Sequence, residues 1–76
     1  MNNLNNSYIS PTLAQIHTLY ELVLKDNMPT NKSYLDNAHV IVDKIGWNRF
    51  VECINRMDND GTPKCLCDIA IAMIIA

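Results

Sequence analysis

The sequence predicts an all-α fold, a compact bundle of about four short helices. Apolar residues recur at three- and four-residue spacing in several segments. Helix-start residues precede these segments, and no stretch alternates cleanly between apolar and polar as a half-buried strand does. The chain of 76 residues is 49% hydrophobic and 18% charged, which allows one domain with a small core. We therefore expect a flexible Asn-rich tail over residues 1–9 and a single helical domain over residues 10–76.

The first helix is predicted over residues 11–26. Ser10-Pro11 is a typical start, with a hydroxyl cap followed by proline at the first helical position. Met28-Pro29 ends the pattern, because the residue before a proline avoids helical geometry. The apolar stripe in between consists of Leu13, Ile16, Leu19, Tyr20, Val23 and Leu24.

Two further helices are predicted over residues 33–45 and 47–58, with Gly46 as the cap between them. Thr30 or Ser33 can cap the first of the pair. The stripe of that helix is Tyr34, Leu35, Ala38, Ile41, Val42 and Ile45. The next helix carries Trp47, Phe50, Val51, Ile54 and Met57 on one face and polar residues on the other.

A fourth helix is predicted over residues 63–75, because Thr62-Pro63 repeats the start signal of the first helix. It is apolar nearly all round, with Asp68 as its one charge, and such a helix is normally buried. A strand is the alternative, since the segment is rich in isoleucine, but nothing else would pair with it. If this helix is partly exposed, its apolar residues form a self-association surface. The small core of a single chain then favours a homodimer. That surface would comprise Ile71, Met73, Ile74 and Ile75.

Charge favours neither a nucleic-acid binder nor an acidic DNA mimic, so a protein is the default partner. Six basic residues are scattered against eight acidic ones, for a formal charge of −2. A nucleic-acid binder usually has a basic excess, because phosphate neutralisation supplies most of its affinity. No run of either sign exists to form a strongly charged face.

The three cysteines are interpreted as buried free thiols in a reducing, cytoplasmic setting. An odd count and an N-terminus without a secretory pattern favour this interpretation. Cys65 and Cys67 would point about 200° apart on a helix, and Cys53 with His17 or His39 would have to complete a metal site. We therefore expect no metal, and the apolar run from residue 69 to 76 is too short to span a membrane.

No catalytic or cofactor-binding motif stands out. Asp58-Asn59-Asp60-Gly61 superficially resembles a calcium loop, but its anchor positions fall on Arg56 and Cys67, so a turn is expected. Neither His17 nor His39 has a nucleophile and an orienting group at readable spacing. The chain is expected not to be an enzyme and to need no cofactor.

Residues 33–57 leave one alternative open, a small helix-turn-helix-like DNA-binding regulator. Glycine is typical of that turn, and Asn48, Arg49, Asn55 and Arg56 would face the bases and phosphates. Against it, the downstream apolar positions of such a motif fall on Glu52 and Asn55. A helix hairpin with a solvated face is favoured.

A non-enzymatic protein-binding module is therefore the expected function. Aromatic and arginine residues dominate protein interfaces, which places the candidate surface on the third helix. It comprises Trp47, Asn48, Arg49, Glu52, Asn55 and Arg56. In size and composition, though in no motif, the chain is similar to small inhibitors encoded by bacterial viruses and mobile elements, anti-CRISPR proteins among them. That similarity implies an inhibitor or modulator that sterically blocks a larger bacterial complex; a homodimeric structural or adaptor protein is a second alternative.

Overall fold

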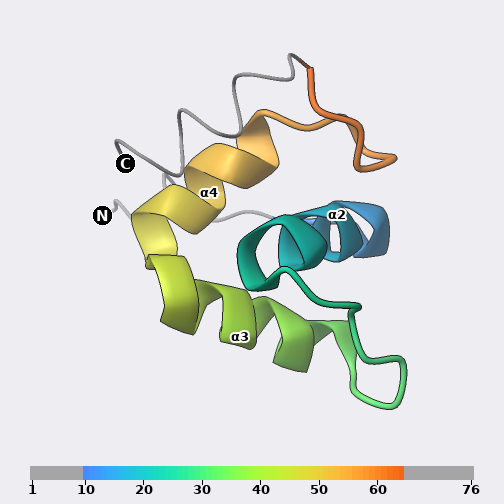
Figure 1. The fold of residues 1–76 in the computed structure, drawn as a ribbon. Helices are drawn as coiled ribbons and strands as arrows, with labels where there is room; N and C mark the ends of the chain where they lie inside the picture. Colours follow the sequence, from blue (N-terminus) through green and yellow to red (C-terminus); the bar gives the residue numbers. More distant parts are fainter. Residues whose placement is uncertain (1–9, 65–76) are drawn as a thin grey trace.

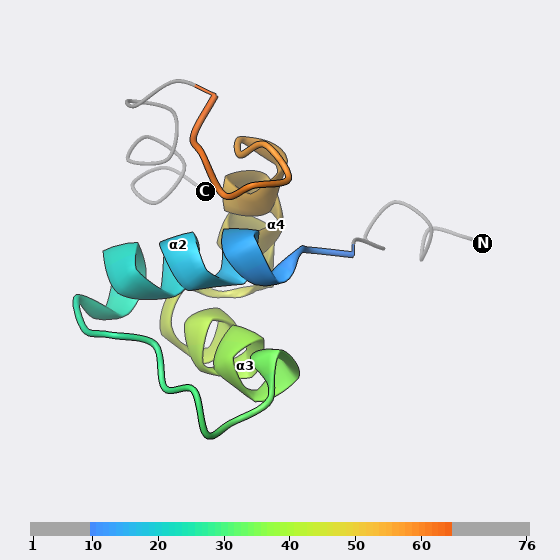
Figure 2. The same cartoon turned by 90° about the vertical axis from the view of Figure 1, so that its right-hand side faces the viewer.

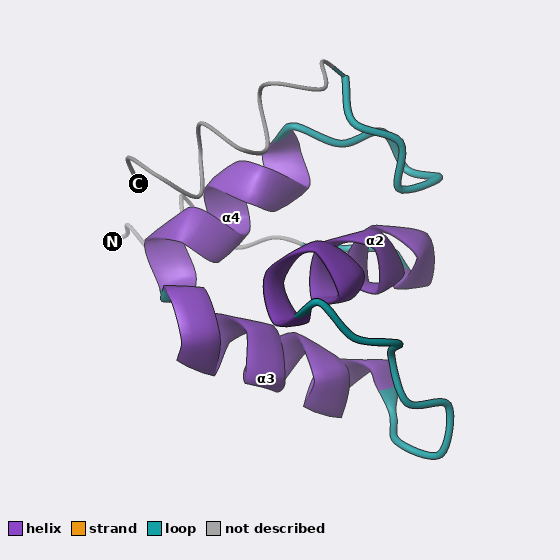
Figure 3. Cartoon of the chain, in the orientation of Figure 1, coloured by secondary structure: helices purple, strands orange, loops and turns teal. Residues whose placement is uncertain are grey.

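The computed structural model describes residues 10–64, which form three helices and no strand (Figures 1 and 3). The helices are α2 (Leu13–Leu24), α3 (Tyr34–Ile45) and α4 (Trp47–Asn55). The all-helical prediction is confirmed for this part of the chain. The predicted tail over residues 1–9 lies outside the described residues, and so does nearly all of the predicted helix over residues 63–75.

α2 is shorter than the predicted range 11–26, because its cap is Thr12 and not Ser10. The Thr12 hydroxyl accepts a hydrogen bond from the backbone N–H of Gln15 at 3.1 Å, and the Gln15 side chain accepts from the N–H of Thr12 at 2.9 Å. This reciprocal capping box satisfies two N–H groups that a helix start leaves unpaired. At the other end, Lys25 adopts the left-handed conformation (φ +56°), and its N–H donates to the carbonyl of Glu21.

Of the two predicted caps, Thr30 and Ser33, the structure has Ser33 at the start of α3, and its hydroxyl accepts a hydrogen bond from the N–H of Asp36 at 3.2 Å. Gly46 ends the helix and, at φ +90°, turns the chain directly into α4. α4 stops at Asn55, although the predicted helix continued to residue 58. The reason is that Met57 leaves the helical path and pairs with Pro63 in an isolated antiparallel bridge.

The bridge also overturns the predicted helix start at Thr62-Pro63. The N–H of Lys64 donates to the carbonyl of Arg56 at 2.9 Å, and the N–H of Asp58 donates to the carbonyl of Thr62 at 2.8 Å. Residues 57–64 therefore form a tight reversal. The turn predicted for residues 58–61 is confirmed, and Gly61 donates to the carbonyl of Asp58 across it.

Within this turn the carboxylate of Asp60 accepts a hydrogen bond from the N–H of Thr62 at 2.9 Å. The bond stabilises the charged carboxylate and lowers the pKa of Asp60 from its ordinary value.

α2 lies across the angle between α3 and α4 and packs against both (Figures 1 and 2). The core lies where the three helices meet. It consists of Ile16, Leu19, Ala38, Ile41, Phe50, Cys53, Ile54 and Met57.

Several apolar residues predicted for the stripes remain outside this core. Leu13, Tyr34, Leu35 and Trp47 are 41–59% exposed, and each lies in the first turn of its helix. The core is small, and the first turns extend beyond the region where the helices cross. Leu22, in the third turn of α2, is a further exposed large apolar residue at 40%.

A single buried side chain, Gln15, connects α2 to the segment that follows α4. Its amide nitrogen donates to the carbonyls of Met57 at 3.2 Å and Asp58 at 3.1 Å, while its oxygen completes the capping box. The Thr12 hydroxyl adds a bond of 2.6 Å to the carbonyl of Asn59. The start of α2 is thereby held against the reversal.

Gly61 brings the reversal into direct contact with α2. A Cβ atom at this position would lie 2.5 Å from the carbonyl oxygen of Ala14 and 2.6 Å from the hydroxyl of Thr18. The backbone at Gly61 also has φ +84°, which L residues rarely adopt. Only glycine fits both requirements.

We expect Gly61→Ala to lower the free energy of unfolding by about 3 kcal/mol, from a backbone clash added to the cost of positive φ. The matched control is Gly46→Ala, which shares the positive φ (+90°) but has no atom within 4 Å of the new Cβ. It should cost about 1 kcal/mol. Urea denaturation followed by circular dichroism measures both. Equal losses in the two variants would contradict the close approach of Gly61 to α2.

We expect Gln15→Glu to lower the free energy of unfolding by about 2 kcal/mol at pH 7. The carboxylate still accepts from Thr12, but it cannot donate to the carbonyls of Met57 and Asp58 and repels them instead. Lowering the pH protonates the carboxyl and restores a donor, so the difference from the native protein should narrow. A difference independent of pH between 7 and 4 would argue against this contact.

Candidate functional site

The candidate binding site is an apolar groove between α3 and the first turn of α4, here called the Trp47 groove. It has a volume of about 190 Å³. It is lined by Pro11, Leu35, Ala38, His39, Val42, Trp47 and Phe50. The floor is part of the core, since Phe50 is 2% exposed, whereas Leu35 on the rim is 57% exposed.

Trp47 is fixed in this groove by stacking on Phe50. The ring centroids lie 5.7 Å apart, and the ring planes are inclined by 30°. Trp47 remains 44% exposed. A large aromatic ring that is held on one side and open on the other loses little side-chain entropy on binding, which is typical of interface anchors.

Carboxylates border the α3 side of the groove. Asp36, His39 and Asp43 are all exposed and follow one another at three- and four-residue spacing, so they share one face of α3. His39 itself lines the groove. The titratable groups of α3 on this rim are therefore two carboxylates and one imidazole.

Of the six residues predicted for partner binding, Trp47 lies apart from the five polar ones. Successive helical residues are about 100° apart, so Arg49 lies about 200° around α4 from Trp47. Glu52 and Arg56 form an ion pair, in which two nitrogens of the Arg56 guanidinium donate to one carboxylate oxygen of Glu52 at 2.9 and 3.1 Å. The other two predicted residues, Asn48 and Asn55, are exposed. The structure therefore places Trp47 in the groove and the charged residues on a different side of α4.

The groove residues contributed by α3 and by the segment before α2 were not predicted as a site. Leu35 and Val42 were assigned to the core stripe, and Pro11 was interpreted only as a helix-start residue. These residues line one groove with Trp47 only because of the way α3 and α4 cross. The predicted self-association residues Ile71, Met73, Ile74 and Ile75 lie outside the described residues.

The connection between α3 and α4 differs from that of a helix-turn-helix motif. Such motifs join their helices by a turn of three or four residues. Here Gly46 alone separates Ile45, the last residue of α3, from Trp47, the first of α4. The geometry therefore favours the helix-hairpin interpretation.

The remaining candidates carry no site in the described part of the chain. His17 is an exposed surface residue that pairs with Glu21 at 3.3 Å. No three histidine, cysteine or acidic residues among residues 10–64 are grouped to hold a metal ion. Cys65 and Cys67 lie outside the described residues.

Cys53 is a fully buried free thiol, as predicted. Burial raises its pKa above the ordinary value, and the neighbouring carboxylate of Glu52 raises it further. A raised thiol pKa lowers the fraction of thiolate, which is the reactive form. Cys53 is therefore a packing residue in this fold.

Comparison with protein-family models, with curated proteins and with solved structures finds no match to this chain. Among the helices of residues 10–64, none has the length and apolar character needed to cross a bilayer. The assignment of function therefore depends on the surfaces themselves.

We expect alkylation of Cys53 by iodoacetamide to be at least about 100-fold slower in the native protein than in urea, because the thiol is buried and mostly protonated. Peptide mass spectrometry resolves Cys53 from Cys65 and Cys67. Labelling should remain slow as the pH rises past the ordinary thiol pKa. Rapid labelling of Cys53 at neutral pH would show that the core opens readily or that the thiol is accessible.

Proposed function

We propose that this protein is a non-enzymatic protein-binding module and that it engages its partner through the Trp47 groove. The observation that supports the proposal is Trp47, a partly exposed aromatic residue stacked on the core at the edge of an apolar groove. Buried aromatic anchors surrounded by apolar contacts supply most of the affinity at protein interfaces.

The partner is proposed to present an apolar side chain flanked by lysine or arginine. The apolar side chain fills the groove between Leu35 and Trp47. The basic residues meet the carboxylates of Asp36 and Asp43 on the α3 rim. Complementary charge at a rim mainly raises the association rate and suppresses wrong partners, while the apolar anchor sets the affinity.

Steric occlusion is the mode of action proposed for the module. A domain of this size that covers a functional surface of a larger bacterial complex acts as an inhibitor or modulator without any chemistry of its own. This mode of action requires that the Trp47 groove be the surface that contacts the complex.

We expect Trp47→Ala to weaken binding of the captured partner by about 30-fold, as for an aromatic anchor. The measurement begins with affinity capture from a nuclease-treated bacterial lysate, followed by purification of the retained protein and calorimetric titration. Leu22→Ala is the matched control, because Leu22 is 40% exposed on α2 and does not line the groove. It should leave the affinity unchanged.

Two double variants test the contribution of the α3 carboxylates and the DNA-binding alternative. Asp36→Lys with Asp43→Lys should slow association and reduce its dependence on salt. Arg49→Ala with Arg56→Ala should have little effect. DNA binding that falls steeply with salt and disappears in the double arginine variant would refute the proposal and favour the regulator. Equal weakening by Leu22→Ala and Trp47→Ala would place the contact elsewhere.

A further inference from the structure

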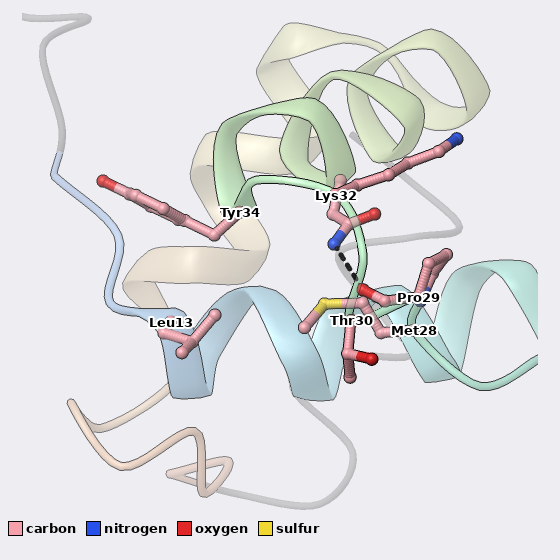
Figure 4. A pocket seen from close by; sticks show the side chains of 7 residues that line it. Leu13, Met28, Pro29, Thr30, Lys32 and Tyr34 are labelled. Atoms are coloured by element: carbon pink, nitrogen blue, oxygen red, sulfur yellow. Dashed lines mark hydrogen bonds between the residues drawn. The ribbon is translucent and has the colours of Figure 1, made fainter.

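A second cavity lies between α2, the segment before α3 and the start of α3, and it shares no lining residue with the Trp47 groove. Its volume of about 300 Å³ is at the lower end of the range for small-molecule pockets. It is lined by Leu13, Met28, Pro29, Thr30, Lys32, Tyr34 and Asn37 and is called the Asn37 cavity below. Figure 4 shows Leu13 and Tyr34 on one side and Met28, Pro29 and Thr30 on the other.

Asn37 contributes a buried polar group that is only half satisfied. The residue is 1% exposed, and its amide nitrogen donates to the carbonyl of Pro29 at 3.1 Å. Its amide oxygen has no hydrogen-bond partner, the one such buried side-chain atom found in residues 10–64. A buried acceptor without a donor is destabilising, and such groups in native proteins usually have a specific reason.

The remaining walls favour a neutral, apolar occupant. Leu13 is 59% and Tyr34 41% exposed, and Met28 and Pro29 are half-buried beside them. Lys32 is the charged residue of the lining, and Figure 4 shows its ammonium group directed away from Leu13 and Tyr34. Aliphatic, thioether and aromatic side chains all make favourable contacts with an aromatic ring.

We propose that the Asn37 cavity binds a neutral aromatic ring of indole or phenol size that carries one N–H or O–H donor. The ring packs against Leu13, Met28 and Tyr34, and its donor bonds to the amide oxygen of Asn37. Bulk water does not reach this oxygen. The donor reaches it when exposed side chains of the lining, such as Lys32, move aside, because exposed side chains rotate within nanoseconds.

The test uses two nearly isosteric probes, indole and benzofuran, which differ by the presence of the N–H donor. Each is titrated into the full-length ¹⁵N-labelled protein, and the backbone and asparagine side-chain amide signals are followed by NMR. Indole should shift the signals of Leu13, Tyr34 and the Asn37 side chain. Benzofuran should bind about fivefold more weakly, because it leaves the oxygen of Asn37 unpaired.

A pair of equally exposed leucines provides the control. Leu13→Ala should weaken both probes, whereas Leu35→Ala, with 57% exposure on the other groove, should leave both unchanged. A third probe, N-acetyltryptophanamide, shows whether the natural ligand is a free molecule or a tryptophan side chain of a protein. Binding as tight as that of indole indicates the side chain. Loss of binding indicates a free molecule.

Three results would overturn the proposal: no shift at these residues with indole, equal affinities for indole and benzofuran, or weakening by Leu35→Ala. A nuclear Overhauser contact from the Asn37 amide to a long-lived water that indole does not displace would also do so. The indole and benzofuran titrations probe the Asn37 cavity alone, and Leu35→Ala enters them only as the control from the Trp47 groove, so this site and the proposed function can fail separately.

Discussion

The side chain of Gln15 sets the relation between the first and last described segments of the chain. It closes the cap of α2 and also donates to two carbonyls of the reversal that follows α4. A short amide is suited to this role because it is both donor and acceptor at one point. Gly61 completes the contact, since only a residue without a Cβ lets the reversal lie on α2. Together they tie segments more than 40 positions apart in the sequence.

This constraint determines where the apolar surface is exposed. With α2 held across the angle of α3 and α4, the core lies where the three helices meet and continues past the end of α4 to Met57. The first turn of each helix extends beyond it and carries large apolar residues outward. Leu13 and Tyr34 then line the Asn37 cavity, and Leu35 and Trp47 line the Trp47 groove. Both candidate surfaces arise because the core is too small to bury the whole apolar face of each helix.

The two surfaces differ in chemistry because different elements close them. The Trp47 groove rests on Phe50, and two carboxylates of α3 lie beside its lining residue His39, which suits a protein segment. The segment around Pro29 lines one side of the Asn37 cavity. Its carbonyl accepts a hydrogen bond from the amide nitrogen of Asn37, and the amide oxygen of Asn37 is left without a partner. The ligand proposed for this site is a neutral aromatic ring with one hydrogen-bond donor.

The sequence by itself determined the helical class, the break at Gly46 and the burial of Cys53, because these depend on local spacing and backbone preference. It left the cap of α3 open between Thr30 and Ser33, and the structure selects Ser33. It misplaced the start of α2, since Ser10-Pro11 and Thr12 are both good caps and only Gln15 selects between them. Local signals also predicted a helix start at Pro63, where contacts with Met57 hold the backbone in a bridge. The grouping of Trp47 with Leu35 was decided by the crossing of α3 and α4, whereas the separation of Trp47 from Arg49 follows from helical periodicity within α4. Residues distant in sequence form a surface only when packing brings them together.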